Sequence, residues 1–483
     1  MPEVSGATHE VGVDQLFFST TDARGVIRHS NNVFIELSRY SRRQLSGAPH
    51  NIIRHPEMPG GAFKAMWDTL QAGSPFAAYV RNLAADGSEY AVFATVTPLS
   101  DGGYLSVRTR PMRDDLFETA CAIYRDARAV EDAAIEAGDN RREASVKGLA
   151  RIAELLAAAG MSSYEDFQNA ALPAEVARRE EMSEGIPQRP GATGDLAEML
   201  SSVSAITDGL DSWMAGQGEL AELSASLKAA GAALTETLAD PRLTATTIAA
   251  LDRGDARVKP LADLLDLWMQ MQGIVSPLVN RLVETLAQLD LNGARTRFRI
   301  ALARLHATIT ALFTVELIDG VGETQYSAES IPDLIESLTA GLEEMERAAE
   351  AHRALSAQAV ATIGEASRMM VIPNQLLMLW TASPAAKDPQ LPAAAAGLSA
   401  AASGVVETVR QRLAELDALA ASCQRLDVAA GASDLRGHLA ALTRAAASVA
   451  PSSSSPGRAP ERGAGPAAPA ATPCGAPRLG CAP

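Results

Sequence analysis

The sequence changes character near residue 113, and this change constrains the fold more than any other feature. Aromatic and β-branched residues gather in the first 112 positions, together with the strongest turn signals. From Asp114 onward, long segments rich in Ala, Leu, Glu and Arg carry apolar residues three and four positions apart. The first pattern is typical of strands and tight turns, and the second of amphipathic helices. We therefore expect an α+β domain over residues 1–112, followed by an all-α helical bundle or coiled coil.

Turn residues divide the N-terminal part into five strands and several short helices. The Asp-Gly pair at 86–87 and the turn at 22–25 each join two neighbouring strands. Asn31 is expected to cap a helix that continues through Tyr40, and a later helix covers 62–70. This order predicts one antiparallel sheet with short helices across one face, which encloses a pocket for a flat ligand. The strands are predicted at 16–21, 26–30, 76–83, 89–98 and 103–110.

The rest of the chain is predicted to form long helices. The stretch 184–195 contains Pro and Gly and is interpreted as a linker between a helical connector, 113–183, and a signalling or dimerisation region, 196–450. Pro373 is expected to start or kink a helix. The tail 451–483 has no core-forming residues and is expected to be disordered. Helices are predicted at about 114–158, 196–238, 243–317, 328–382 and 393–448.

Charge and composition exclude several functional classes. A net charge of −16 does not suit a general nucleic-acid binder, which needs a basic face. The first residues lack a secretory signal, and no window approaches 18 uninterrupted apolar residues. We therefore expect a soluble, cytoplasmic protein that binds neither nucleic acid nor membrane. We expect neither a structural metal nor a disulfide framework, because the four cysteines do not have the spacing of a zinc site. They are Cys121, Cys423, Cys474 and Cys481.

The sequence also lacks the common catalytic patterns. It contains no Gly-x-Ser-x-Gly elbow, no phosphate-binding loop and no His-Glu-x-x-His zinc motif. The adjacent acids Glu343 and Glu344 are interpreted as a solvated helix face, and His306 and His352 as structural histidines. We expect a non-enzymatic protein whose output passes to another protein.

The polar chemistry of the first domain concentrates at 51–59, Asn-Ile-Ile-Arg-His-Pro-Glu-Met-Pro. Pro56 biases the residue before it toward extended backbone, which holds Arg54 and His55 in place. Alone, this segment would be interpreted as a Pro-rich surface turn. Its neighbours favour a functional interpretation, because polar and aromatic blocks recur along the domain: HSNNVF at 29–34, GAPHNIIRHPEMP at 47–59, AMWDTL at 65–70, Arg81-Asn82, DGSEY at 86–90 and YLSVRTR at 104–110.

In this unbroken order the blocks resemble the PAS domain of bacterial aerotaxis receptors, over roughly residues 10–112. The resemblance implies that FAD binds non-covalently and that its redox state reports oxygen or electron-transport status. Two positions depart from the family pattern, with Glu57 in place of the usual aspartate and Phe76 where a tryptophan is common. The cofactor contacts that the resemblance implies are Asn31, Arg54, His55, Glu57, Trp67 and Asn82.

The chemistry of these side chains agrees with a flavin. The amides of Asn82 and Asn31 can hydrogen-bond with its pyrimidine edge, and Trp67 can pack against its rings. Reduction changes the charge of the flavin, and this change would act electrostatically on a nearby Arg54 or His55. Two alternatives stay open: haem held by His55 or His50, and an interaction scaffold with no cofactor.

The helical region resembles a chemoreceptor signalling region only in outline. NQLLMLWTA at 374–382 lies where a receptor tip would be, but SPAAKD at 383–388 replaces the acidic and arginine positions that should follow. A coiled-coil dimerisation bundle with Leu376, Leu377 and Leu379 in its core is the alternative. The expected function is a homodimeric redox or oxygen sensor that signals to a chemotaxis kinase or coupling protein. Its signal would pass through 108–114 into a helix starting at Asp115.

Overall fold

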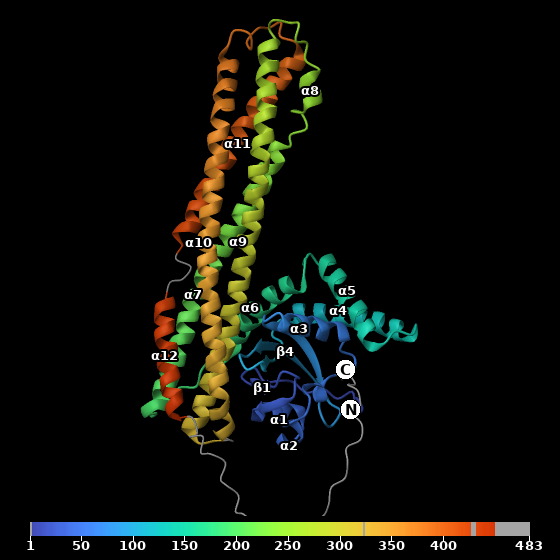
Figure 1. The fold of residues 1–483 in the computed structure, drawn as a ribbon, viewed down its shortest axis with the longest axis vertical. Helices are drawn as coiled ribbons and strands as arrows, with labels where there is room; N and C mark the ends of the chain where they lie inside the picture. The colour runs from blue at the N-terminus through green and yellow to red at the C-terminus, as the bar shows by residue number, and fades with distance from the viewer. Residues whose placement is uncertain (1, 322–323, 427–430, 450–483) are drawn as a thin grey trace, which may run out of the picture. The chain divides into compact units, whose positions relative to one another are not determined.

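The computed structural model describes residues 2–321, 324–426 and 431–449 (Figure 1). The tail 451–483, for which disorder is predicted, lies outside the described residues. Within them the chain forms an antiparallel sheet with short helices, followed by a long helical region, so the predicted fold class is confirmed.

Five strands form the sheet, in the order β2-β1-β5-β4-β3, with every neighbouring pair antiparallel. The predicted strands are confirmed with ends shifted by one residue at most, because aromatic and β-branched residues bounded by tight turns determined both. The strands are β1 (Phe17–Thr21), β2 (Ile27–Ser30), β3 (Phe76–Leu83), β4 (Glu89–Pro98) and β5 (Tyr104–Thr109).

Short helices between β2 and β3 cover one face of the sheet, which we call the inward face. Register places Phe17 opposite Arg108 and Asn82 opposite Tyr90, so all four side chains belong to this face. Phe17 and Phe34 stack with ring centroids 4.0 Å apart. The covering elements are α1 (Asn32–Ser38), α2 (Arg42–Leu45), the 3₁₀ helix η1 (His50–Ile53) and α3 (Gly60–Gln71).

The opposite, outward face of the sheet packs against helices from later in the chain. Phe18, Tyr79, Phe93, Leu105 and Val107 are buried there. Phe18 of β1 meets Phe313 edge to face, with centroids 5.1 Å apart. The outward face is thus part of the same apolar core as the long helices.

The connector between sheet and bundle consists of three helices, α4 (Asp114–Glu136), α5 (Arg141–Ala158) and α6 (Tyr164–Met182). The prediction of one helix over 114–158 was wrong, because Gly138 takes φ +106° and Asn140 caps a new helix in a capping box with Glu143. Gly61 permits the contact of α3 with α5, since a Cβ there would lie 2.4 Å from the Leu149 backbone nitrogen.

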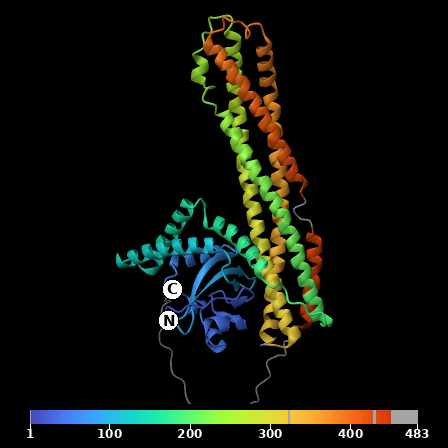
Figure 2. The same ribbon diagram turned by 180° about the vertical axis from the view of Figure 1, so that it is seen from behind.

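The remaining helices form a bundle in which α9 and α10 run side by side (Figures 1 and 2). The predicted helix 243–317 is interrupted: α8 ends at Ala249, and α9 begins at Lys259 with Pro260 in its first turn. Helix α10 continues through position 373, so no helix starts there. The bundle helices are α7 (Gly194–Leu238), α8 (Ala245–Ala249), α9 (Lys259–Asp319), α10 (Thr324–Ala382), α11 (Ala393–Arg425) and α12 (Ala432–Val449).

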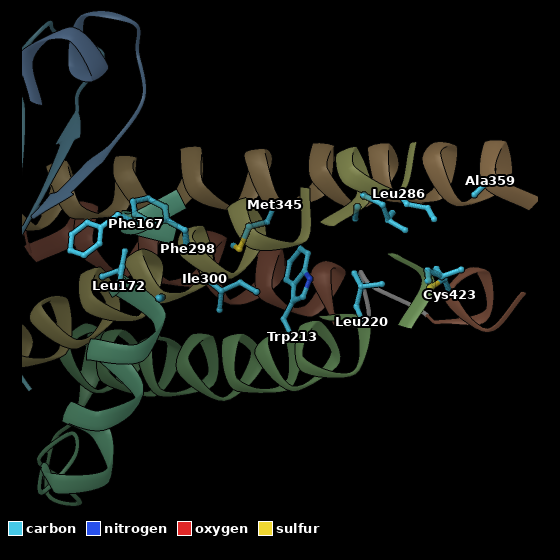
Figure 3. Packing of buried hydrophobic residues seen from close by; sticks show 14 of the residues in the cluster. Phe167, Leu172, Trp213, Leu220, Leu286, Phe298, Ile300, Met345, Ala359 and Cys423 are labelled. Carbon is cyan, nitrogen blue, oxygen red and sulfur yellow. The ribbon is translucent and has the colours of Figure 1, made fainter. Parts of the chain in front are cut away.

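Large apolar side chains from α7, α9 and α10 meet in the bundle core, among them Trp213, Ile300 and Met345 (Figure 3). Leu377 is buried, whereas Leu379 is 68% exposed. Among the described helices, α9 alone is long and apolar enough to cross a membrane, and 72% of its apolar window is buried. The apolar character of α9 therefore serves the bundle core.

Candidate cofactor-binding site

The segment 51–59, which we call the hook, includes most of η1 and leads into α3. His55 is 1% exposed, and its Nδ1 accepts a hydrogen bond from the Glu57 backbone nitrogen at 3.3 Å. Its Nε2 lies 3.4 Å from Oε1 of Glu89 on β4. Burial and the nearby Arg81 cation lower the pKa of His55, which favours the neutral ring.

Arg54 and Glu57 attach this hook to the sheet edge in different ways. Arg54 forms a β-bridge with Asn82, donates from Nη2 to the Met58 carbonyl at 2.9 Å, and lies 4.1 Å above the Phe63 ring. The Glu57 carboxylate is 67% exposed and accepts from Nη1 of Arg81 at 2.6 Å. Glu57 therefore faces solvent and fixes the hook from outside.

Asn82 and Tyr90 lie opposite each other on the inward face, 2% exposed each. Within the described residues, neither Nδ2 of Asn82 nor the Tyr90 hydroxyl has a hydrogen-bond partner. Burial raises the pKa of Tyr90, so its hydroxyl keeps the proton and is available as a donor. Two buried polar groups in this part of the domain are thus available for hydrogen bonding.

Arg108 lies on the same face, further along the sheet. It is 8% exposed, and its guanidinium lies 4.7 Å above the Phe17 ring. Its Nη2 lies 3.5 Å from Nδ1 of His50, whose Nε2 is 3.2 Å from the Ser19 hydroxyl. Desolvation and the Arg108 cation hold the pKa of His50 well below its usual range. Burial lowers the pKa of Arg108 to about 10, so it remains a cation beside a neutral imidazole.

The six residues predicted from sequence do not all meet. Arg54, His55, Glu57 and Asn82 come together at one corner of the sheet. Trp67 instead packs edge to face against Tyr104, with centroids 5.4 Å apart. Tyr104 pairs with Pro98 on β4, whereas Asn82 pairs with Tyr90, roughly 26 Å away along that strand at 3.3 Å per residue.

Asn31 is occupied by backbone contacts. Its Oδ1 accepts from the backbone nitrogens of Phe18 and Phe34 at 3.0 and 3.1 Å, and its Nδ2 donates to the Leu16 carbonyl at 2.7 Å. It also lines a small cleft with Phe313 of α9. This amide caps α1, as predicted, and holds β1 in place.

Sequence reasoning missed Arg108 and Tyr90. The available signal was a charged residue at an inward position of a strand whose other face is apolar, between Val107 and Thr109. This signal can be interpreted only if it is known which face of the sheet the short helices cover. That information comes from the tertiary fold.

Two buried carboxylates attach the connector helices to the domain. Glu131 of α4 accepts from the backbone nitrogens of Gly60 and Gly61 at 2.7 Å each, and so caps α3. Glu175 of α6 accepts from the Tyr79 hydroxyl at 2.6 Å and from the backbone nitrogens of Met112 and Arg113 at 2.6 and 3.0 Å. Burial raises the pKa of Glu175, although these hydrogen bonds oppose that shift. The link from β5 into α4 is therefore held by α6.

The domain also matches known proteins. Residues 27–107 match the PAS fold family. The chain is 37% identical over 119 residues to the aerotaxis receptor of Escherichia coli K12, covering 24% of each chain. It is 32% identical over 81 residues to the nitrogen fixation regulatory protein of Klebsiella pneumoniae, covering 17% of this chain and 16% of that protein. The chain thus spans a quarter or less of the curated relatives that it matches.

Solved structures of light-oxygen-voltage domains are similar to part of this chain. A domain studied with a flavin analogue is 21% identical over 22% of this chain and 85% of its own, with a TM-score of 0.21. The light-state domain of Aureochrome1 is 22% identical over 22% of this chain and 88% of its own, with a TM-score of 0.20. The family match and the sheet order show that residues 27–107 form a PAS domain, and the chain is similar to the E. coli aerotaxis receptor.

Proposed function

We propose that this protein is a non-enzymatic sensor whose PAS domain binds FAD between the inward face and the short helices. The observation that carries the proposal is the Asn82 amide, which is buried and has no acceptor for Nδ2 among the described residues. A buried donor left unpaired costs about 1–3 kcal/mol. A flavin pyrimidine edge offers both carbonyl acceptors and an N–H donor, which match the two ends of an amide.

The residues around Asn82 fit this role. Arg54 and His55 fix the corner where Asn82 lies, and Trp67 offers an aromatic surface further along the domain. Asn31 and Glu57 act as positioning residues, because their side chains already bind the backbone and Arg81. A bound flavin supplies reversible electron transfer, while the protein orients it and excludes water.

The histidine contacts favour flavin over haem. The two ring nitrogens of His55 face the Glu57 backbone nitrogen and the Glu89 carboxylate. Those of His50 face Ser19 and Arg108. An axial ligand of haem needs a free ring nitrogen, so His50 would have to leave Ser19 or Arg108. Nε2 of His55 has no hydrogen-bond partner among the described residues, but it faces the Glu89 carboxylate at 3.4 Å and would have to turn away from it.

The helical region would carry the output. We propose a cytoplasmic homodimer that relays redox or oxygen state to a chemotaxis kinase or coupling protein, in keeping with the similarity to an aerotaxis receptor. Exposed apolar side chains on α10, Ile372, Met378 and Leu379, support a dimer or partner contact there. The signal would leave through Arg113 into α4, where Glu175 holds the connection.

The test is the absorption spectrum of the purified full chain, before and after incubation with FAD. Wild-type protein should show flavin absorbance, and Asn82→Ala should lose most of the bound flavin. Asn51→Ala is the matched control, because Asn51 is an exposed amide in the same motif. A wild-type chain that stays colourless after reconstitution, or that shows a haem spectrum, would contradict the proposal.

A further inference from the structure

Arg108 is a buried cation that the fold does not neutralise. Arg108 is 8% exposed and pairs in register with Phe17 of β1 and Ala94 of β4, and its guanidinium lies over the Phe17 ring. Across the part of the chain that the structure describes, Nε and Nη1 have no acceptor and no carboxylate forms an ion pair with Arg108. Isolated charges are costly to bury, so buried arginines normally have an anionic partner.

The groups that face Arg108 do not supply that anion. His50 is neutral because its ring is desolvated next to the cation. Tyr90 keeps its proton because it is buried. The Phe17 ring face provides only a cation–π contact. None of these three neighbours carries a negative charge that would neutralise the Arg108 cation.

We infer that Arg108 is the counter-charge for negative charge on a flavin bound at the inward face. This inference rests on the proposed function. When a flavin takes up two electrons and one proton, its ring gains one negative charge. Arg108 would neither give nor take a proton; its fixed positive charge would stabilise the reduced ring more than the oxidised ring. Reduced flavin would therefore bind more tightly than oxidised flavin, and the midpoint potential would be raised.

A purely structural arginine predicts different behaviour. If Arg108 served only to hold Phe17 and β5 together, replacing it would destabilise the ligand-free chain and leave the flavin potential unchanged. If Arg108 awaits an anion, an apolar side chain of similar length should make the ligand-free chain more stable, because an unpaired buried charge has been removed. The thermal stability of the ligand-free chain and the midpoint potential of the bound flavin together distinguish a structural arginine from a counter-charge.

The test uses the full chain reconstituted with FAD and titrated with dithionite beside a reference dye. In Arg108→Met the affinity ratio of reduced to oxidised flavin should fall about tenfold, which lowers a two-electron midpoint potential by about 30 mV. Arg108→Lys keeps the charge and should stay within about threefold of wild type. Arg110→Gln is the control, because Arg110 is exposed and already paired with Glu10. Thermal melting of each ligand-free chain gives the second readout, with Arg108→Met expected to melt above wild type.

The outcomes separate the two proposals. Flavin bound to Arg108→Met with an unchanged ratio overturns the role of Arg108 alone. A ligand-free Arg108→Met chain that melts lower or fails to fold identifies Arg108 as a structural anchor, and also overturns it. A wild-type chain that cannot be loaded with flavin overturns the proposed function together with this inference.

Discussion

Two buried tyrosines on opposite faces of the sheet differ in whether the hydroxyl has a hydrogen-bond partner in the part of the chain that the structure describes. On the outward face, the Tyr79 hydroxyl donates to Glu175, whose carboxylate also accepts from two backbone nitrogens. On the inward face, Tyr90 and Asn82 are equally buried, yet the Tyr90 hydroxyl and Asn82 Nδ2 have no partner among the described residues. Since native interiors normally pair such groups, the contact of Tyr79 with Glu175 is a finished interface, and the unpaired groups on the inward face support the proposed ligand site.

The largest effect should come from breaking the finished interface at Glu175. Glu175→Ala leaves one buried and two half-buried donors unpaired and should lower the free energy of unfolding of the domain by about 3–5 kcal/mol. Glu175→Gln keeps an acceptor and should lose less. Denaturant unfolding followed by near-ultraviolet circular dichroism measures both. The comparison of faces would be wrong if Glu175→Ala were no more harmful than Asn82→Leu.

Two buried tyrosines provide a matched pair, one on each face. Tyr79→Phe removes a hydrogen bond to a carboxylate and should cost about 1.5–3 kcal/mol of unfolding free energy. Tyr90→Phe removes a hydroxyl without a partner in the described structure, so the ligand-free chain should be unchanged or slightly more stable. The same unfolding measurement checks both variants. Equal losses would remove the distinction between the faces.

The smallest expected effect is a loss of folding stability at acidic pH, caused by His50 on the inward face. The pKa of His50 is lower in the folded chain than the ordinary value of 6.5, so its contribution to stability is fully present above 6.5. It is lost as the pH falls below 6.5, by up to about 1.4 kcal/mol per pH unit. His50→Asn should flatten this slope in unfolding curves of the ligand-free chain.

Arg108→Met serves as the control for this slope. It removes one of the two causes of the shift and should flatten the slope only in part, because desolvation of His50 remains. If the unfolding free energy of His50→Asn depends on pH as steeply as that of wild type, other groups control acid unfolding.

Local signals were sufficient for the strands and for one corner of the site. The Asp-Gly turn and the aromatic and β-branched residues on both sides of it predicted β3 and β4, and Asn82 on β3 forms the bridge with Arg54. Other features depend on contacts distant in sequence. An amide such as Asn31 suits a helix cap and a ligand equally well, and only the fold shows that it is a cap. Glu175 lies on α6, which is outside the helix ranges predicted from the sequence, and is 96 residues from Tyr79.

Strand β1 has a consequence for how the domain communicates. Phe17 lies beneath Arg108 on the inward face, and the next residue, Phe18, contacts Phe313 of α9 on the outward face. One peptide unit therefore separates the proposed flavin site from the longest helix of the bundle. If a ligand at the proposed site displaces Phe17, β1 would offer the signal a second route to the bundle, separate from the 108–114 connection.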